Sequence, residues 1–313
     1  MHGQSPSLVA VLLCTFQGEA FLAEQLDSIE GQTHTNWRVW VSDDGSNDGT
    51  CAILARFQSR WGDEKISIVA GPASGSIANF LTLTDCDTVQ GDFFAWADQD
   101  DVWEPDKLAR AVGHLTSHEA HDSSVPALYA TPALLTDAGG AVFGRSTLNR
   151  SPSFANALVQ NIAGGNTMVF NAAARRLIRQ AGAQIGVVAH DWWAYLLVTG
   201  SGGAVLCDGR ATLRYRQHAG NQIGSAPGAW RRALRLGPLL NGQFRRWMDA
   251  NLEALEHHRH LLSPSSLKTL DLFSSARRGP LAARLTRLRR SRVHRSSRLG
   301  NIALFFAVLC NRL

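Results

Sequence analysis

Short apolar runs alternate with amphipathic stretches along the first hundred residues of the chain. Each run is rich in β-branched and aromatic residues and is bounded by polar residues, which is typical of buried strands. The four predicted strands are Leu8–Thr15, Trp37–Ser42, Ile66–Ala70 and Phe93–Ala97. The stretches between them have helical spacing, so the pattern predicts a parallel sheet whose successive strands are connected by helices.

Turn-forming polar residues follow each of the four predicted strands. These turns are Gln17–Gly18, Asp43–Gly49, Gly71–Ser76 and Asp98–Asp101. The carboxyl ends of parallel strands meet at one edge of a sheet, and open sheets bind their ligands at that edge. We therefore expect the four turns to surround a binding site.

The pattern continues with further α/β elements and then becomes purely helical. Pro105 begins a helix over Asp106–Leu115, because the missing N–H of proline costs nothing in a first turn. Later strands and helices are expected at Ala127–Ala130, Thr167–Asn171, Ala172–Ala181 and His190–Val198. From residue 228 onward, apolar residues recur only at helical spacing. The Ser/Arg stretch Arg289–Arg298 is expected to be poorly ordered.

The charge of the chain changes sign where this pattern changes. Residues 1–225 contain 14 Lys and Arg against 22 Asp and Glu, a balance of −8, whereas residues 226–313 contain 17 against 4, a balance of +13. We therefore predict a large domain over residues 1–225 and a basic helical region over residues 226–313. A basic region suits an anionic partner, either lipid or nucleic acid.

Cysteine usage and the ends of the chain indicate the compartment. The five cysteines are spread widely, without Cys-x-x-Cys spacing, which favours a reducing environment. The apolar run after Leu8 is too short for a signal sequence, and Ile302–Cys310 is too short to cross a bilayer, although it could lie on the surface of one. We expect a cytoplasmic protein, with peripheral contact to the inner face of the membrane as a further option.

The strongest chemical signal is a cluster of three carboxylates. Asp98, Asp100 and Asp101 occupy one loop directly after a predicted buried strand. Such crowding is costly unless a cation neutralises it, and Mg²⁺ or Mn²⁺ prefers oxygen ligands and bridges them to a diphosphate. The alternative is an ordinary solvated turn that caps the next helix.

Three motifs together resemble family 2 glycosyltransferases. They are Leu12–Glu19, Val41–Thr50 and Trp96–Leu108, the last of which continues from the acidic loop into Trp-x-Pro-x-Lys-Leu, as the family's Asp-x-Asp motif does. The resemblance covers about residues 8–224 and implies the GT-A fold, a Rossmann-like, mixed, mostly parallel sheet flanked by helices, with the basic helical region outside it. It also implies transfer of a sugar from a nucleotide-sugar donor to a hydroxyl group, with Mg²⁺ or Mn²⁺ as cofactor.

The resemblance extends to residues that bind the nucleotide. Such contacts are implied for Thr15, Phe16, Glu19, Asp44, Asn79 and Asp98. Phe16 replaces the tyrosine that is usual in the family, so that a hydroxyl contact is lost while stacking on the base is retained. Without the neighbouring motifs, Asp43–Asp48 would be interpreted as an ordinary turn whose side chains cap the backbone.

A further segment contains a candidate for the catalytic base. His190–Trp193 resembles the family's Glu/His-Asp-Trp segment, whose Asp is the general base of inverting transfer. The resemblance therefore gives that role to Asp191. The alternative is a helix N-cap.

Two other segments concern the metal and the acceptor. Tyr215–Gly224 resembles the Arg-Gln-His segment of rhamnosyltransferase-like members, which implies that His218 completes the metal site with Asp100 and Asp101. The alternative is a structural histidine. Contacts to the acceptor or the diphosphate are implied for Gly165, Asn166, Trp192, Arg216 and Gln217.

The same resemblance suggests the donor and the acceptor. The predicted donor is dTDP-rhamnose, with a UDP-hexose as the alternative, and the predicted acceptor is a hydroxyl of a polysaccharide or lipid-linked glycan.

In the basic region, arginines alternate with apolar residues, as in amphipathic helices that rest on anionic bilayers. The alternative is a helical subdomain with a solvated basic face. The residues concerned are Trp230, Arg231, Arg232, Leu234, Arg235, Phe244, Arg245, Arg246 and Trp247.

Two other classes of protein fit less well. A nucleotidyltransferase needs a glycine-rich basic loop after its first strand, whereas Phe16–Glu19 carries an acid there. A non-catalytic module that binds nucleic acid is disfavoured, because the acidic first region would repel phosphate and the basic region lacks a recognised motif. We expect an enzyme that binds no nucleic acid.

Overall fold

The computed structural model describes residues 6–148, 151–218, 242–310 and 313. The chain forms two compact units. The first contains Met1–Leu148, Ala163–Gln184 and Ala204–Ser225, and the second contains Asn149–Ile162, Ile185–Gly203 and Ala226–Leu313. The sequence pattern places residues 149–162 and 185–203 in the large domain. In the structure they belong to the same unit as residues 226–313.

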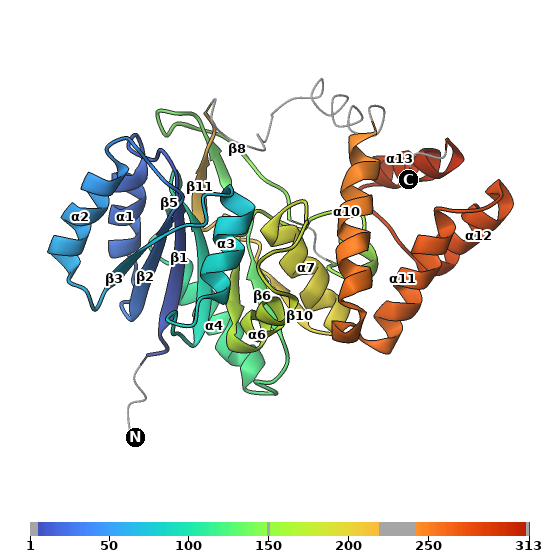
Figure 1. Cartoon of the computed structure of the whole chain (residues 1–313), viewed down its shortest axis with the longest axis horizontal. Helices are drawn as coiled ribbons and strands as arrows, with labels where there is room; N and C mark the ends of the chain where they lie inside the picture. Colours follow the sequence, from blue (N-terminus) through green and yellow to red (C-terminus); the bar gives the residue numbers. More distant parts are fainter. Residues whose placement is uncertain (1–5, 149–150, 219–241, 311–312) are drawn as a thin grey trace. The chain divides into compact units, whose positions relative to one another are not determined.

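The first unit is built around a seven-stranded sheet (Figure 1). Its strand order is β10-β6-β9-β4-β1-β2-β3. The strands are β1 (Val9–Thr15), β2 (Trp37–Asp43), β3 (Ile66–Ala70), β4 (Phe93–Asp98), β6 (Ala127–Ala130), β9 (Val169–Asn171) and β10 (Ala204–Cys207). β1 to β4 are parallel, β9 is antiparallel to β4 and β6, and β10 is parallel to β6. The prediction of a mixed, mostly parallel sheet is confirmed.

Helices cover both faces of this sheet. They are α1 (Leu22–Glu30), α2 (Thr50–Trp61), α3 (Ser76–Asp85), α4 (Lys107–Glu119) and α6 (Ala172–Ala181). Val9, Val11 and Leu13 alternate along β1 and belong to one buried cluster with apolar residues of α1, α2 and α4. On the opposite face, Trp96 of β4 packs edge-on against Phe80 of α3 at 6.4 Å between ring centroids. The alternation follows from side chains that point to opposite faces of a strand.

A small second sheet stands beside the acidic loop. Its order is β5-β11-β7-β8, with β5 (Val102–Trp103), β7 (Leu134–Thr136), β8 (Val142–Arg145) and β11 (Leu213–Arg216). The apolar pattern does not predict these strands, because each has at most four residues and contains at most two adjacent apolar residues. β11 pairs antiparallel with β5, which places the residues after β11 next to the residues before β5.

The second unit is helical in its described part. Its helices are α5 (Phe154–Ala157), α7 (His190–Ser201), α10 (Gln243–His257), α11 (Pro264–Ala276), α12 (Leu281–Ser291) and α13 (Arg298–Leu309). Within the unit, the indole N–H of Trp192 on α7 donates to the carbonyl of Ala157 on α5 at 2.7 Å. Its ring also meets Trp247 of α10 edge-on, at 6.5 Å between centroids. The predicted helical extension is therefore present.

Two expectations for the basic region change with the structure. Phe244, Met248, Leu252 and Leu255 are buried, so the apolar face of α10 is packed while Arg245 and Arg246 are exposed. This arrangement matches the alternative of a packed helix with a solvated basic face.

Arg289–Arg298, expected to be poorly ordered, contains the end of α12 and the start of α13. The membrane hypothesis for Trp230, Arg231, Arg232, Leu234 and Arg235 lies outside the described residues. In the described part of the chain, no helix has the length and apolar character needed to span a membrane.

Candidate active site

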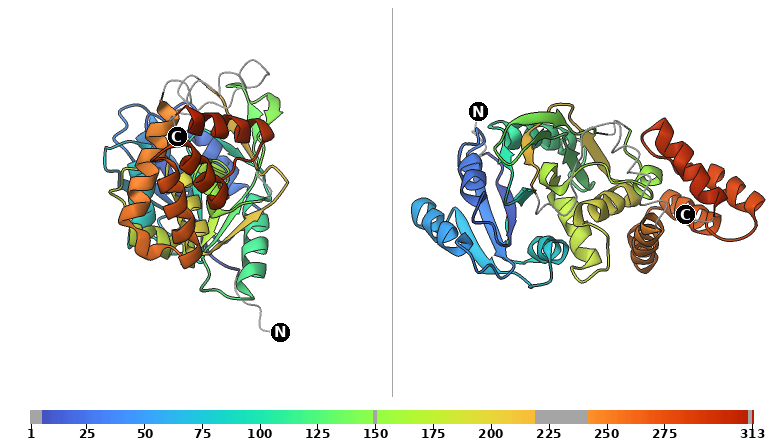
Figure 2. Two further views of the ribbon diagram at one scale, coloured as in Figure 1. Left: turned by 90° about the vertical axis from the view of Figure 1, so that its right-hand side faces the viewer. Right: turned by 90° about the horizontal axis from the view of Figure 1, so that it is seen from above.

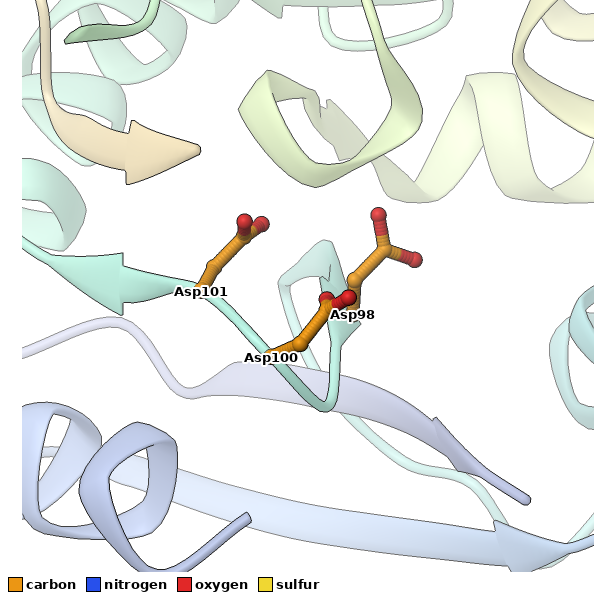
Figure 3. Close-up of side chains that lie close together, drawn as sticks. All are labelled: Asp98, Asp100 and Asp101. Atoms are coloured by element: carbon orange, nitrogen blue, oxygen red, sulfur yellow. The ribbon is translucent and has the colours of Figure 1, made fainter. Parts of the chain in front are cut away.

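The acidic loop brings three carboxyl groups together. β4 ends at Asp98 and β5 begins at Val102, so that Asp98, Asp100 and Asp101 share one tight connection. One carboxyl oxygen from each of the three lies within 4.8 Å of the others. Figure 3 shows that all three side chains point to the same side of the loop. This is the cluster that the sequence predicts.

Asp101 is the buried member of this cluster. Its Oδ2 accepts a hydrogen bond of 2.6 Å from the Asn166 amide, while its Oδ1 is buried with no hydrogen-bond partner among the described residues. Burial and the neighbouring Asp98 and Asp100 raise the pKa of Asp101 well above its usual range, against the opposing effect of Asn166 and Lys107. A buried carboxyl oxygen without a partner, within a cluster of carboxylates, is the environment that a hard divalent cation stabilises.

Lys107 supports the acidic loop through Asn166, which in turn donates to Asp101. Its ammonium group is fully buried, donates to the carbonyl of Asn166 at 2.8 Å and lies 4.8 Å from the centre of the Trp103 ring. Burial lowers the pKa of Lys107, and Asp101 opposes that effect. One lysine does not balance three carboxyl groups, so the cluster fits Mg²⁺ or Mn²⁺.

His218 and Arg216 approach the acidic loop from β11. Nε2 of His218 lies 2.8 Å from Oδ2 of Asp100. Among the described residues, the side chains grouped closely enough to hold a metal are Asp98, Asp100 and Asp101, so a metal contact of His218 stays a prediction. The guanidinium of Arg216 is buried, donates to the backbone carbonyls of Asp100 (3.2 Å) and Ala138 (2.7 Å), and pairs with Glu24 of α1. These contacts are structural ones, to the loop and to α1. A contact between Arg216 or Gln217 and a diphosphate stays a prediction.

Polar side chains gather at the carboxyl ends of β1, β2 and β3, where the nucleotide is predicted to bind. Asp44 accepts a hydrogen bond from the N–H of Gly75 at 2.8 Å, and its buried Oδ1 has no hydrogen-bond partner among the described residues. Asn79 is held by Ser42 through two hydrogen bonds. A Cβ atom at Gly71 would lie 2.8 Å from Asp44 Oδ1 and 2.9 Å from Asn79 Oδ1, so only glycine fits beside these two oxygens.

Thr15 and Glu19 are engaged with the same turns. The Thr15 hydroxyl donates to Asp43 at 2.7 Å, and Glu19 accepts from the N–H of Gly49 at 3.0 Å. Burial acts to raise the pKa of Asp43, but hydrogen bonds from Ser46, Thr15 and nearby backbone groups together lower it. The turns are therefore preformed around an ionised Asp43.

Gln99 connects the acidic loop to the turn that follows β1. Its amide accepts from the N–H of Phe16 and donates to the carbonyl of Phe16, both at 2.8 Å. A Cβ atom at Gly18 would approach Gln99 Oε1 to 2.4 Å, which explains the glycine there. The Phe16 side chain is 56% exposed and offers a ring for stacking. Sequence reasoning misses Gln99, although its position between two carboxylates is a signal.

The remaining predicted residues divide between the two units. Gly165 and Asn166 form a 3₁₀ turn, Gly165–Thr167, in the first unit, where Asn166 supports Asp101. Asp191 and Trp192 belong to the second unit, in the first turn of α7. The N-cap of α7 is Ala189 and the helix begins at His190, so the interpretation of Asp191 as an N-cap is wrong. The catalytic role of Asp191 stays a prediction.

A mostly parallel mixed sheet with a carboxylate-rich loop after its fourth strand is the architecture of GT-A glycosyltransferases. A solved structure, the mannosyltransferase PcManGT from Pyrobaculum calidifontis in complex with GDP-Man and Mn²⁺, is similar with a TM-score of 0.52 and 17% identity, over 99% of this chain and 86% of that one. Residues 10–178 match the model of glycosyl transferase family 2. Because this match covers more than half of the chain, the protein belongs to glycosyl transferase family 2.

Two relatives whose names include a donor sugar are similar to this chain. The dTDP-rhamnosyl transferase RfbG of Shigella flexneri is 28% identical over 256 residues, which cover 78% of this chain and 84% of RfbG. WfgD of Escherichia coli, a UDP-Glc:α-D-GlcNAc-diphosphoundecaprenol β-1,3-glucosyltransferase, is 28% identical over 105 residues, or 34% of this chain and 40% of WfgD. The family resemblance expected from the sequence motifs is confirmed.

Proposed function

We propose that this glycosyltransferase transfers rhamnose from dTDP-rhamnose to a hydroxyl of a polysaccharide or lipid-linked glycan, in a metal-dependent reaction that inverts the anomeric carbon. The observation that carries the proposal is the cluster of Asp98, Asp100 and Asp101, with its buried oxygen and adjacent His218. The extended similarity to RfbG supports the donor. A UDP-hexose is the second candidate, because WfgD uses a UDP-sugar.

The nucleotide is proposed to bind at the carboxyl ends of β1 to β3. Phe16 offers an exposed ring to the base, and the unpartnered Asp44 Oδ1 is an acceptor for the ring N–H that thymine and uracil share. Asp44 would therefore favour thymine, uracil or guanine, which carry a ring N–H, over cytosine and adenine, and would not distinguish dTDP from UDP. Thr15, Glu19 and Asn79 hold the backbone and side chains around Asp44 in place through hydrogen bonds to Asp43, Gly49 and Ser42.

The acidic loop is proposed to hold Mg²⁺ or Mn²⁺ through Asp98, Asp100 and Asp101, with His218 beside them. When bound, the ion stabilises the negative charge of the departing nucleoside diphosphate. Arg216 and Lys107 hold the loop in place through its backbone and through Asn166. The loop is thus preorganised before a donor arrives, which is how a site lowers the cost of charge development.

Asp191 is proposed to be the general base. It accepts the proton of the attacking hydroxyl while the acceptor oxygen forms a bond to the anomeric carbon and the bond to the diphosphate breaks on the opposite side. One displacement without a covalent enzyme intermediate inverts the configuration. The family motif and the place of Asp191 within the first turn of α7, rather than at its N-cap, support this role.

A cytoplasmic location is part of the same proposal. All five cysteines are free, and Cys51 and Cys310 are exposed, which suits a reducing compartment. Acceptors attached to lipid would be reached from the inner face of the membrane.

The test is a panel of dTDP-, UDP- and GDP-sugars with purified protein and Mg²⁺ or Mn²⁺, scored by thermal shift and nucleotide release. We expect one dTDP-sugar to stabilise the protein only with metal, with loss of that shift in Asp100→Asn. Asp191→Asn should keep the shift and lose turnover, and Asp63→Asn, an exposed control, should change neither. Absence of a response to every nucleotide sugar would refute the proposal, whereas a response to UDP-sugars alone would replace its donor.

A further inference from the structure

Helix α13 exposes a continuous apolar face. The exposed fractions are 72% for Leu299, 52% for Ile302, 46% for Phe305 and 57% for Phe306. Their spacing places them along one side of the helix, while Leu304, Ala307 and Val308 are buried on the other side. Among the residues that the structure describes, no other helix exposes more than one large apolar side chain. α13 is the dark red helix that follows α12 in Figures 1 and 2.

The sequence around this face is rich in arginine and contains no acidic residue. Residues 272–313 contain ten arginines and no lysine, aspartate or glutamate. Arg289, Arg290, Arg292 and Arg298 form no ion pair within the described part of the chain. Arg289 and Arg292 line the same surface cavity as Leu304 and Phe305, so guanidinium groups of α12 lie directly beside α13.

An anionic lipid surface satisfies both features at once. Apolar side chains gain by entering the boundary between headgroups and acyl chains, and guanidinium groups bind lipid phosphates in a bidentate manner. A second copy of the chain would cover the apolar face but bring two arginine clusters together. A nucleic acid would neutralise the arginines and leave the phenyl rings in water.

We propose that α12 and α13 bind an anionic bilayer through Leu299, Ile302, Phe305 and Phe306, flanked by Arg289, Arg290, Arg292 and Arg298. With 12 residues, α13 is about 18 Å long, shorter than the roughly 30 Å hydrocarbon core, so it lies in the plane of the interface. This surface includes the run Ile302–Cys310, for which the sequence allows contact with a bilayer, and it differs from the amphipathic surface on residues 230–247. The inference stands without the proposed function.

Vesicle sedimentation tests the surface in the full chain. Wild-type protein should bind vesicles that contain phosphatidylglycerol and not vesicles of phosphatidylcholine alone. Phe305→Ser/Phe306→Ser should weaken binding by about tenfold or more, because two phenyl rings lose their burial in the interface. Arg289→Gln/Arg290→Gln should weaken it less and reduce its dependence on salt.

The matched controls Val142→Ser/Phe143→Ser and Arg56→Gln/Arg176→Gln exchange exposed residues of the first unit and should bind as wild type does.

A second measurement reports insertion directly. Cys310 follows α13, and only Cys310 and Cys51 are exposed among the five cysteines. An environment-sensitive fluorophore on Cys310, in a Cys51→Ser chain, should shift to the blue and be quenched by a quencher attached to lipid. The same fluorophore on Cys51, in a Cys310→Ser chain, should do neither.

Three results would overturn the proposal. These are no binding by the wild type, equal binding by the α13 variant, and a sedimentation-velocity dimer that the α13 variant abolishes, which would make a second copy the occupant. Circular dichroism and thermal unfolding establish that each variant is folded. The thermal shift caused by nucleotide sugars should be the same in all variants, so that failure of membrane binding and failure of the proposed function are distinguished.

Discussion

Arg216 connects the acidic loop to a helix far away in the chain. Its partner Glu24 is 192 residues away in sequence, and the Asp100 carbonyl lies on the loop itself. Its planar guanidinium also stacks 4.7 Å above the Phe21 ring, whose centroid is 5.0 Å from that of His218. A planar group with donors in several directions is needed for such a set of contacts, and a lysine ammonium does not supply it.

We therefore expect Arg216→Lys to reduce kcat/KM about tenfold or more, because small displacements of reacting groups are costly. The loss should be accompanied by a higher Mn²⁺ concentration for half-maximal activity, since the loop loses its support. Arg214→Lys, on the same strand and paired with Glu104 at the surface, is the control. Unchanged kinetics in Arg216→Lys would show that the loop holds its shape without this residue.

The residues of the site can be predicted only where their signal is local. Asp98, Asp100 and Asp101 are neighbours in sequence, so their mutual repulsion is evident from the order of the residues alone. Gln99 and Glu24 escape prediction because a loop amide and a helix carboxylate look like solvated side chains until their partners 83 and 192 residues away are known.

At the scale of elements, the length and the apolar character of a run together decide what the sequence predicts. The first four strands have five to seven residues and long apolar runs, and each begins and ends within one residue of its predicted bounds. β5 has two residues and β11 has four. The two strands pair with each other, and a sequence pattern that covers only neighbouring residues does not reveal this long-range pairing. The large sheet is therefore predictable, whereas the strand that delivers His218 is not.

Asp208 joins three elements of the first unit. It follows β10, accepts from Arg110 of α4 at 2.6 and 2.8 Å, and accepts from the Tyr129 hydroxyl of β6 at 2.9 Å. Burial acts to raise the pKa of Asp208, but hydrogen bonds from the Arg210 N–H, Arg110 and Tyr129 outweigh it and lower the pKa. The folded-state pKa thus lies below the unfolded value of about 3.9, so the carboxylate stabilises the fold above that pH and loses its effect as the pH falls through the folded-state value.

Asp208→Asn should lower the free energy of unfolding by about 2 kcal/mol at neutral pH, because a charged acceptor is lost while Arg110 stays partly buried. The difference from wild type should shrink in acid. Urea unfolding at neutral and acidic pH measures both values, with the exposed Asp63→Asn as the control. A difference that is independent of pH would contradict this account of Asp208.

At the scale of the whole molecule, the two units do not follow one another along the chain. Residues 149–162 and 185–203 belong to the second unit together with residues 226–313. In that unit α7 packs against α5 and α11, and its Trp192 meets Trp247 of α10. The basic region therefore provides part of the hydrophobic environment of α7.

A chain that ends at residue 225 should consequently lose more than its positive charge. We expect it to aggregate, or to elute from gel filtration as a larger species than its mass predicts, because α7 loses α10 and α11. A chain that ends at Ser297 lacks only α13 and its last residues and should remain largely monomeric. Cooperative unfolding of a monomeric 1–225 chain would refute this expectation.

The same interleaving affects the order in which the protein is made. α7 consists largely of buried apolar residues and is synthesised before any part of α10 or α11. The 75 residues between the end of α7 and the end of α11 take roughly 4 to 15 seconds to translate. During that interval the nascent chain contains the apolar helix α7 without its contacts to α10 and α11. Production in a heterologous host should therefore depend on chaperones that hold this helix and on slow synthesis at low temperature.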